Sequence, residues 1–266
     1  MRIALGLEYD GAGFSGWQSQ VGGNTVQDAL EAALAAVAGH PVRVVCAGRT
    51  DAGVHATAQV VHFDVAVSRP VTAWVRGANA HLPHSIAVRW ASPVADDFHA
   101  RFAARSRSYR YLLLNRPERP GLLAGRVGWC HRPLDLAAMR QAAACLPGEH
   151  DFSSFRAAGC QAKTPIKTLY RFEIERQGDV VVFDCCANAF LHHMVRNLVG
   201  ALVYVGLGRM CPEDFGRLLE ARDRRLGAPT YAPDGLYLTG VEYDEQWALP
   251  QHGRIMALPC LPIGYR

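Results

Sequence analysis

The sequence predicts an α+β fold made of two related halves. Three observations carry this prediction. Strand-like and helix-like runs follow one another as β-α-β-β-α-β in the first hundred residues, and the same order recurs in the remainder. A chain of 266 residues also exceeds the usual size of one domain and supplies ample core. We therefore expect two ferredoxin-like halves, residues 1–100 and 101–266, with antiparallel or mixed sheets flanking a central catalytic cleft.

The first half contains clear helix boundaries between its strand-like runs. Thr25 followed by Asp28 is typical of a capped helix start, and Gly39 of a helix end. Pro70 favours the start of a second helix. The predicted elements are a strand at 2–9, a helix from 25 to 39, strands at 42–46 and 58–65, a helix at 70–82 and a strand at 85–90.

The second half repeats this order with one additional helix. Asp135 is a typical helix cap, and Gln177-Gly178-Asp179 is typical of a hairpin turn. After Trp247 the chain is rich in proline, and we expect an irregular tail there. The predicted elements are a strand at 108–114, a helix at 135–146, a hairpin of 169–176 with 180–187, a helix at 188–205, the extra helix at 212–222 and a closing strand at 236–243.

Composition places the protein among ordinary globular chains. Half of the residues are hydrophobic and a fifth are charged. No apolar run approaches the 18 or so residues of a membrane span, and the first residues enter a strand-like pattern instead of a signal peptide, so we expect a cytoplasmic protein without a membrane partner. The eight cysteines include no C-x-x-C pair and are interpreted as reduced thiols, neither a disulfide framework nor a zinc site.

Charge is unevenly distributed along the chain. Residues 1–100 carry a net charge of −2 and residues 101–266 a net charge of +6. Between Arg101 and Arg119 there are six arginines and one acid, with Phe102, Tyr109 and Tyr111 interleaved. This mixture suits contact with phosphates and stacking on bases. It equally suits a solvated face in a protein that prefers arginine to lysine, and on charge alone both interpretations stay open.

The segment Gly48–His55, with the sequence GRTDAGVH, lies between two β-rich runs. It is therefore predicted to be a loop held by rigid strands, a common place for catalytic residues. A simple hairpin turn needs no arginine and histidine beside its aspartate. Asp51 is our candidate catalytic residue, and the alternative is that its carboxylate only caps a turn.

Gly11–Gly16 matches the G-x-G-x-x-G pattern of dinucleotide-binding loops. In such proteins a helix opens directly on the glycines, whereas here the helix is predicted to start only near Thr25. A nicotinamide-dependent oxidoreductase is thus a weak alternative. A loop that places Phe14 and Trp17 beside a ligand fits better.

The helix predicted at 188–205 is strongly apolar, with a narrow polar stripe that includes Arg196 and Asn197. A single arginine on such a helix needs a carboxylate or phosphate partner if it is buried, although a stripe of this kind can also simply face solvent. His192 and His193 are adjacent, and adjacent helix positions diverge. We therefore predict no metal site there.

Several segments in one order make the chain resemble the tRNA pseudouridine synthase A family, and the resemblance covers essentially the whole sequence. Besides the Asp51 loop, it rests on Glu8-Tyr9-Asp10-Gly11, Gly16-Trp17-Gln18, Gln59-Val60-Val61-His62-Phe63, Phe98-His99-Ala100-Arg101-Phe102, Tyr109-Arg110-Tyr111, Asp151-Phe152-Ser153-Ser154-Phe155-Arg156, Ala189-Phe190-Leu191-His192-His193-Met194-Val195-Arg196-Asn197 and Gly235-Leu236-Tyr237-Leu238.

The resemblance implies an activity and a set of roles. Family members convert uridine to pseudouridine at nucleotides 38–40 of the tRNA anticodon arm, and they act as homodimers. Asp51 matches the catalytic aspartate, the nucleophile. Tyr109 matches a tyrosine that stacks on the target base, Arg196 a basic residue that pairs with the aspartate, and Arg49 a residue that helps to extrude the base.

The isomerisation breaks and remakes a glycosidic bond without redox change or group donor, so no cofactor is required. Attack at C1′, attack at C6 and removal of the C2′ proton all suit a single carboxylate. The main rival interpretation is a non-catalytic RNA-binding protein with two RRM-like halves. Against it, no strand carries the aromatic RNP1 pattern, and the most site-like loop centres on a carboxylate, which repels phosphate.

Overall fold

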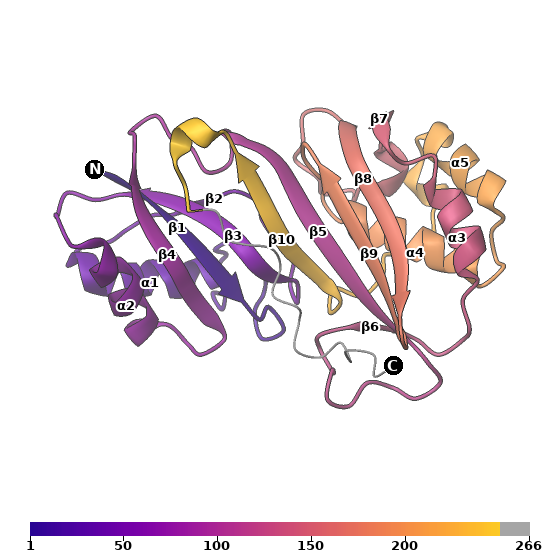
Figure 1. Ribbon diagram of the computed structural model, residues 1–266, viewed down its shortest axis with the longest axis horizontal. Coiled ribbons are helices and arrows are strands. Elements are labelled where there is room, and N and C mark those ends of the chain that lie inside the picture. Colours follow the sequence, from indigo (N-terminus) through magenta and orange to yellow (C-terminus); the bar gives the residue numbers. More distant parts are fainter. Residues whose placement is uncertain (251–266) are drawn as a thin grey trace. The chain divides into compact units, whose positions relative to one another are not determined.

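The computed structural model describes residues 1–250 and consists of two compact units (Figure 1). Within the described residues, unit 1 comprises 1–107 and 237–250, and unit 2 comprises 108–236. Strand β5 (Ala104–Asn115) carries the chain from unit 1 into unit 2, and β10 (Leu236–Tyr243) brings it back. The irregular tail predicted after Trp247 lies, from residue 251 onward, outside the described residues.

Unit 1 has the predicted order of elements. Strand β1 lies between β4 and β3 and is antiparallel to both, while β2 and β10 pair with different parts of β3, β10 in parallel. The sheet of unit 1 is therefore mixed. Its elements are β1 (Arg2–Tyr9), α1 (Val26–Ala38), β2 (Val45–Cys46), β3 (His55–Asp64), α2 (Val71–His81), β4 (Ile86–Val94), β10 and the short helix η3 (Glu245–Trp247).

Local sequence explains the helix boundaries of unit 1. The Thr25 hydroxyl accepts a hydrogen bond from the Asp28 N–H at the start of α1, which satisfies an otherwise unpaired donor of the first turn. At the end of α1, Gly39 adopts a left-handed conformation (φ 78°) that residues with a Cβ disfavour. Helix α1 packs against α2, and α2 packs against β4. Both predicted helices of the first half are confirmed.

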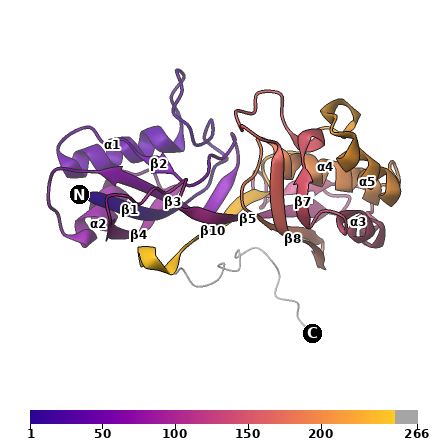
Figure 2. The same cartoon turned by 90° about the horizontal axis from the view of Figure 1, so that it is seen from above.

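Unit 2 contains an antiparallel hairpin of β8 and β9, with strand order β5-β9-β8-β7 and β6 paired in parallel with β5. Helices α3, α4 and α5 pack against one another and lie together in both views (Figures 1 and 2). The elements are β6 (Gly128–Cys130), α3 (Leu136–Ala143), β7 (Gly148–Asp151), η1 (Ser153–Phe155), β8 (Ile166–Gln177), β9 (Val180–Ala187), α4 (Met194–Gly206), α5 (Pro212–Ala221) and η2 (Arg224–Leu226).

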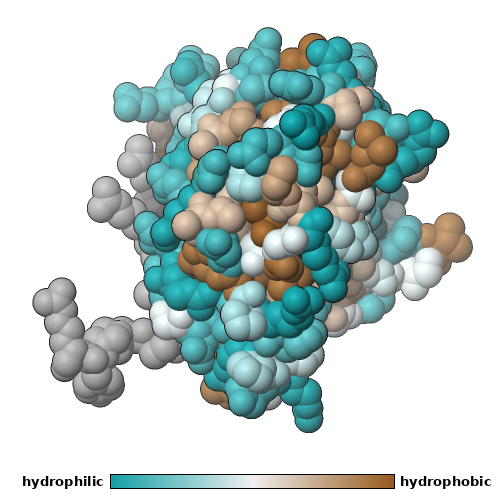
Figure 3. All heavy atoms as spheres, turned by 90° about the vertical axis from the view of Figure 1, so that its right-hand side faces the viewer, coloured by the Kyte–Doolittle hydropathy of each residue, from teal (hydrophilic) through white to brown (hydrophobic). Residues whose placement is uncertain are grey.

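The surface of unit 2 over α3 and α5 is mostly hydrophilic, with hydrophobic residues interspersed (Figure 3). Helix α5 illustrates why: Phe215, Leu218 and Leu219 are buried, and the rest of the helix is largely polar.

No helix among residues 1–250 is long and apolar enough to cross a membrane. The predicted α+β class is confirmed, with a mixed sheet.

One predicted element is wrong in a way that matters for the site. The helix expected from Asn188 begins only at Met194, and the residues before it form a turn. His193 precedes the helix with a left-handed backbone (φ 62°). The apolar pattern continues through this turn because Leu191 is buried whether or not it is helical. Hydrophobic periodicity alone therefore places the helix start too early.

Candidate active site

Asp51 lies on a loop between β2 and β3, as predicted. Its side chain is half-buried, and that of Arg49 is exposed. Directly before the loop, burial raises the pKa of the Cys46 thiol to about 12, although the Arg49 guanidinium opposes the shift. This thiol therefore stays protonated at neutral pH, which leaves Asp51 and Arg49 as the reactive and charged groups of the segment 46–52.

The glycine-rich loop after β1 supports the Asp51 loop directly. The backbone N–H of Trp17 donates to the Thr50 carbonyl (3.0 Å), which anchors the residue next to Asp51. A Cβ at Gly16 would lie 2.9 Å from the Thr50 carbonyl oxygen, and one at Gly11 would lie 2.0 Å from that of Val54. These glycines therefore permit close packing of one loop on another, which explains a G-x-G-x-x-G match without a dinucleotide.

Two side chains near these loops are structural. Trp17, expected beside a ligand, is only 1% exposed and packs near the Tyr9 ring, so that expectation is wrong. A tryptophan of this size stabilises the fold most when fully buried. His55 is 2% exposed, accepts a hydrogen bond from the Gly11 N–H (3.0 Å) and stacks on Tyr237 (4.6 Å between ring centroids). Both residues hold the glycine-rich loop and β3 in place.

In unit 2, Tyr109 projects from β5 and is 8% exposed. Its ring meets that of Phe190 edge to face, with centroids 4.9 Å apart and planes at 79°. The Cys185 thiol donates to the Tyr109 carbonyl, which fixes the backbone as well. A ring held in this way keeps one orientation, as a stacking platform requires. Phe190 was missed as a supporting residue, although it lies in the same motif as Arg196.

Arg196 lies in the first turn of α4, half-buried. Its Nε donates to the Tyr231 carbonyl (2.9 Å), and its own carbonyl accepts from the Tyr231 N–H (3.2 Å). The stripe around it does not face solvent: Asn197 is 2% exposed, and a Cβ at Gly200 would lie 2.3 Å from the Pro229 carbonyl oxygen. The chain near Tyr231 covers this side of the helix and holds Arg196 in a defined position.

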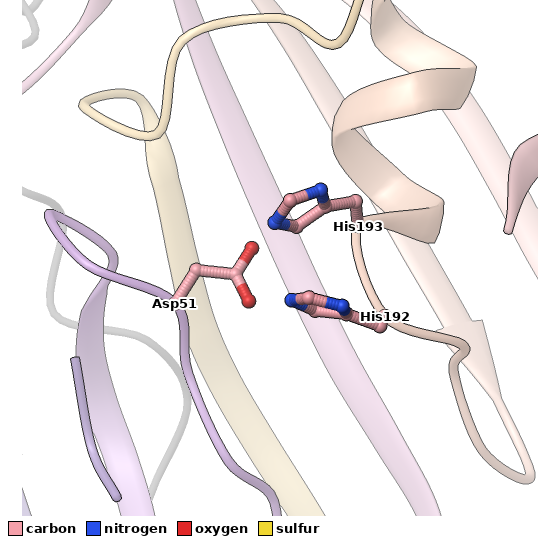
Figure 4. A group of neighbouring side chains, drawn as sticks. All are labelled: Asp51, His192 and His193. Atoms are coloured by element: carbon pink, nitrogen blue, oxygen red, sulfur yellow. The ribbon is translucent and has the colours of Figure 1, made fainter. Parts of the chain in front are cut away.

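His192 and His193 lie on the turn ahead of α4; Figure 4 draws them, together with Asp51 on its own loop. Backbone bonds hold the turn, since the Ala157 N–H donates to the His192 carbonyl and the His192 N–H donates to the Cys160 sulfur. The two ring centroids are 4.0 Å apart, so the argument that the imidazoles diverge along a helix is wrong. That no metal is required stays a prediction.

The arginine-rich segment is mostly engaged within the protein. Arg107 is buried and donates to the carbonyls of Ala47, Arg101 and Ala104. Among the other arginines, Arg105 pairs with Asp244, Arg110 with Asp184 and Arg116 with Asp179, whereas Arg101 and Arg119 are exposed.

The aromatic residues of this segment also differ from one another. Tyr111 is fully buried, and Phe102 is 76% exposed. Neither interpretation of the segment therefore holds throughout. It is not a continuous solvated face, and only part of it is available to a phosphate.

The four predicted site residues thus come from two places. Arg49 and Asp51 share one loop of unit 1, and Tyr109 and Arg196 are held by neighbouring chain within unit 2. Arg49 is exposed, Asp51 and Arg196 are half-buried, and Tyr109 is fixed in orientation by the packed ring of Phe190. This set comprises a carboxylate, two guanidinium groups and an aromatic ring. Such groups suit nucleophilic chemistry on a base attached to a phosphate backbone.

Comparison with known proteins identifies the chemistry. A family model described as tRNA pseudouridine synthase matches residues 7–103 and 142–244. A tRNA pseudouridine synthase A of Dechloromonas aromatica is 66% identical over 250 residues, covering 94% of this chain and 95% of the relative. One of Aromatoleum aromaticum is 62% identical over 263 residues, covering 99% and 100%. The protein is an isomerase of the tRNA pseudouridine synthase class.

Within that class the chain belongs to the tRNA pseudouridine synthase A family. Membership sets aside the non-catalytic RNA-binding protein and the oxidoreductase. Among solved structures, a Cbf5-Nop10-Gar1 complex is similar with a TM-score of 0.41 and 13% identity, covering 89% of this chain and 48% of the other. That similarity is too low to bear on the fold.

Proposed function

We propose that the enzyme converts uridine to pseudouridine at nucleotides 38–40 of the tRNA anticodon arm, without a cofactor, and that Asp51 is the nucleophile. The supporting observation is a family relationship of 66% identity in a chain whose Asp51 lies half-exposed on a braced loop between two strands. The carboxylate starts the reaction at the target nucleotide. The N1–C1′ bond breaks, the uracil turns, and a C1′–C5 bond forms; C5 loses its proton and N1 gains one, so the reaction is an isomerisation that needs no co-reactant.

The target base must leave its stack before Asp51 reaches it, which costs a few kcal/mol. We propose that Arg49 helps to extrude the base and occupies the space it leaves. Tyr109 then stacks on the extruded base, and base–aromatic stacking returns about 1–3 kcal/mol. The edge-to-face packing of Tyr109 on Phe190 supports this role, because a ring with a fixed plane loses little freedom on binding.

Arg196 is proposed to pair with Asp51, so that the carboxylate stays ionised and correctly aimed. A nearby guanidinium favours the charged form of a carboxyl group. Supporting this role, Arg196 is half-buried and its Nε is already bonded to a backbone carbonyl. Its remaining N–H groups can therefore donate in a fixed direction.

The architecture belongs to the same proposal. We propose that residues 1–100 and 101–266 are two ferredoxin-like halves, the second of which contributes its last strand, β10, to unit 1. The βαββαβ order of unit 1 supports this for the first half. We further propose a homodimer in which one tRNA contacts both subunits. A size measurement that finds only monomer at working concentration would contradict it.

The proposal is tested by incubating the purified protein with an unmodified tRNA transcript, without any added cofactor, and mapping pseudouridine along the product. We expect pseudouridine at one or more of nucleotides 38, 39 and 40 and nowhere else. Product at other positions would contradict the substrate assignment. A requirement for an added cofactor would contradict the mechanism.

A further inference from the structure

Thr50 faces the protein within the Asp51 loop. It is 7% exposed, whereas its neighbours Arg49 and Asp51 are exposed and half-exposed. The two residues proposed to act on RNA therefore flank a buried residue. The contacts that hold Thr50, and Gly48 before Arg49, decide how Arg49 and Asp51 are presented.

Gln59 holds Gly48, the residue before Arg49. The ladder between β2 and β3 continues to the bond from the Ala47 N–H to the Val60 carbonyl (2.8 Å). At the next position the Gln59 side chain takes the place of backbone: its Nε2 donates to the Gly48 carbonyl (2.6 Å), and its Oε1 accepts from the Gly48 N–H (3.4 Å). A side-chain amide carries the same donor and acceptor as a peptide group. Gln59, a residue of β3, thus extends the pairing between β2 and β3 past the end of β2, as far as Gly48.

Tyr9 holds Thr50, the residue between Arg49 and Asp51. Its hydroxyl lies 2.8 Å from the Thr50 hydroxyl oxygen and also accepts a longer bond from Gln59 Nε2 (3.4 Å). Tyr9 is 4% exposed and Gln59 fully buried, and burial raises the pKa of the Tyr9 hydroxyl, so it stays protonated. Buried polar groups without partners are costly, so this network strongly favours one loop conformation.

We propose that Tyr9 and Gln59 are positioning residues for the reaction: through Thr50 and Gly48 they set the conformation from which Asp51 and Arg49 meet the RNA. This inference rests on the proposed function, because it takes Asp51 to be the nucleophile. Both residues are buried, so they act through the loop and not by direct contact with RNA. Their effect is on the chemical step, since small displacements of a reacting group lower rates far more than they lower binding.

The test removes the Tyr9–Thr50 bond from either side with little change of shape. Tyr9→Phe deletes only the phenol oxygen, and Thr50→Val replaces the hydroxyl by a methyl group. For each variant we expect the single-turnover rate of pseudouridine formation to fall about tenfold or more, with the dissociation constant for tRNA changed by less than about twofold. The double variant should be no slower than the slower single variant, because both substitutions remove the same Tyr9–Thr50 bond.

Asn79 supplies a matched control in the same unit. Its side-chain amide makes the same pair of bonds to backbone, donating to the Val88 carbonyl (2.8 Å) and accepting from the Val88 N–H (2.7 Å), on the strand β4. Asn79→Ala should lower the melting temperature and leave the single-turnover rate of the folded enzyme unchanged. A loss of rate in Asn79→Ala comparable to that in Tyr9→Phe would mean that any lost buried hydrogen bond of unit 1 impairs the enzyme, and would overturn the proposal.

Other outcomes are equally decisive. Unchanged rates in Tyr9→Phe and Thr50→Val, or effects that multiply in the double variant, would also overturn the positioning role. Asp51→Asn, measured in parallel, separates this from the proposed function. If Asp51→Asn is active, the nucleophile assignment fails; if it is inactive while Tyr9→Phe reacts like the wild type, only the positioning role fails.

Discussion

The loop that carries Asp51 and the turn that leads into α4 are held in opposite ways. The Asp51 loop is held by a network of buried side chains besides backbone bonds: the Tyr9 hydroxyl contacts that of Thr50, and the Gln59 amide binds Gly48. The turn at His192 and His193 is held through its own backbone, since the His192 carbonyl accepts from the Ala157 N–H, the His192 N–H donates to the Cys160 sulfur, and His193 leads directly into α4. The two parts of the proposed site should therefore respond differently to substitution.

The difference leads to a general expectation. Changes around the Asp51 loop should propagate, because a buried polar network transmits a displacement to every member. Changes at Arg196 should remain local, because the side chain and its Nε bond to the Tyr231 carbonyl are lost, whereas the bond from the Tyr231 N–H to the Arg196 carbonyl remains.

Apart from substitution of Asp51 itself, the largest effect is expected from Arg196→Ala. Removing the guanidinium leaves Asp51 without its proposed partner, and we expect the single-turnover rate to fall about 100-fold or more while stability changes little. Arg217→Ala is the matched control, since Arg217 is an exposed helical arginine of the same unit that pairs with Asp214. A rate loss in Arg217→Ala equal to that in Arg196→Ala, measured with pre-bound tRNA, would contradict a specific role for Arg196.

The next effect is expected from Gly16→Ala. Gly16 has a φ of 95°, and an added Cβ would lie 2.9 Å from the Thr50 carbonyl oxygen and 3.0 Å from the Ala52 nitrogen. We expect the free energy of unfolding to fall by about 1–3 kcal/mol, with a loss of activity in the folded fraction. Thermal unfolding and single-turnover kinetics measure both.

The same loop provides the control for this substitution. An added Cβ at Gly13 would meet no atom within 4 Å, and the φ of Gly13 is not positive. Gly13→Ala should therefore behave like the wild type in both measurements. If Gly13→Ala and Gly16→Ala prove equally harmful, packing against the Asp51 loop is not the reason for the glycines.

A smaller effect concerns salt. If exposed arginines of the basic segment contact phosphates, log affinity should fall less steeply with log salt concentration in Arg101→Gln and in Arg119→Gln. In each variant the magnitude of the slope should decrease by about 1. Arg110→Gln should leave the slope unchanged, because Arg110 pairs bidentately with Asp184. Titration of tRNA at several salt concentrations measures these slopes. A slope that falls only in Arg110→Gln would refute the assignment.

No effect is expected from removing metal ions that bind imidazoles. The two histidine rings lie close enough to hold a metal, yet the isomerisation needs no Lewis acid. Treatment of the enzyme with a transition-metal chelator, followed by assay in buffer that supplies magnesium for the tRNA, should leave the rate unchanged. Loss of activity restored by zinc would contradict this.

Much of the fold was predictable because local signals mark it. The Thr25 cap and the left-handed Gly39 set the bounds of α1, and the glycines around Asp51 mark its loop. The start of α4 was not predictable, because a buried turn and a buried helix share one apolar pattern. The two-residue strand β2 was predicted too long, since β-branched composition does not show how far a strand is paired.

The supporting residues of the site were less accessible than the site itself. Asp51 stands out because an arginine and a histidine accompany it in one loop. Tyr9, Thr50 and Gln59 come together only in the folded chain, from positions as much as 50 residues apart. The one local signal was Gln59, a polar residue within an apolar strand. Such a residue needs a buried partner, but the sequence does not identify it.

The central claim is that the Asp51 carboxylate performs the chemistry. It is tested most directly by comparing wild-type enzyme with Asp51→Asn in single-turnover reactions on a tRNA transcript, with tRNA binding measured in parallel. We expect the variant to bind tRNA with near wild-type affinity and to form no pseudouridine at nucleotides 38–40. Detectable turnover by the folded variant would contradict it.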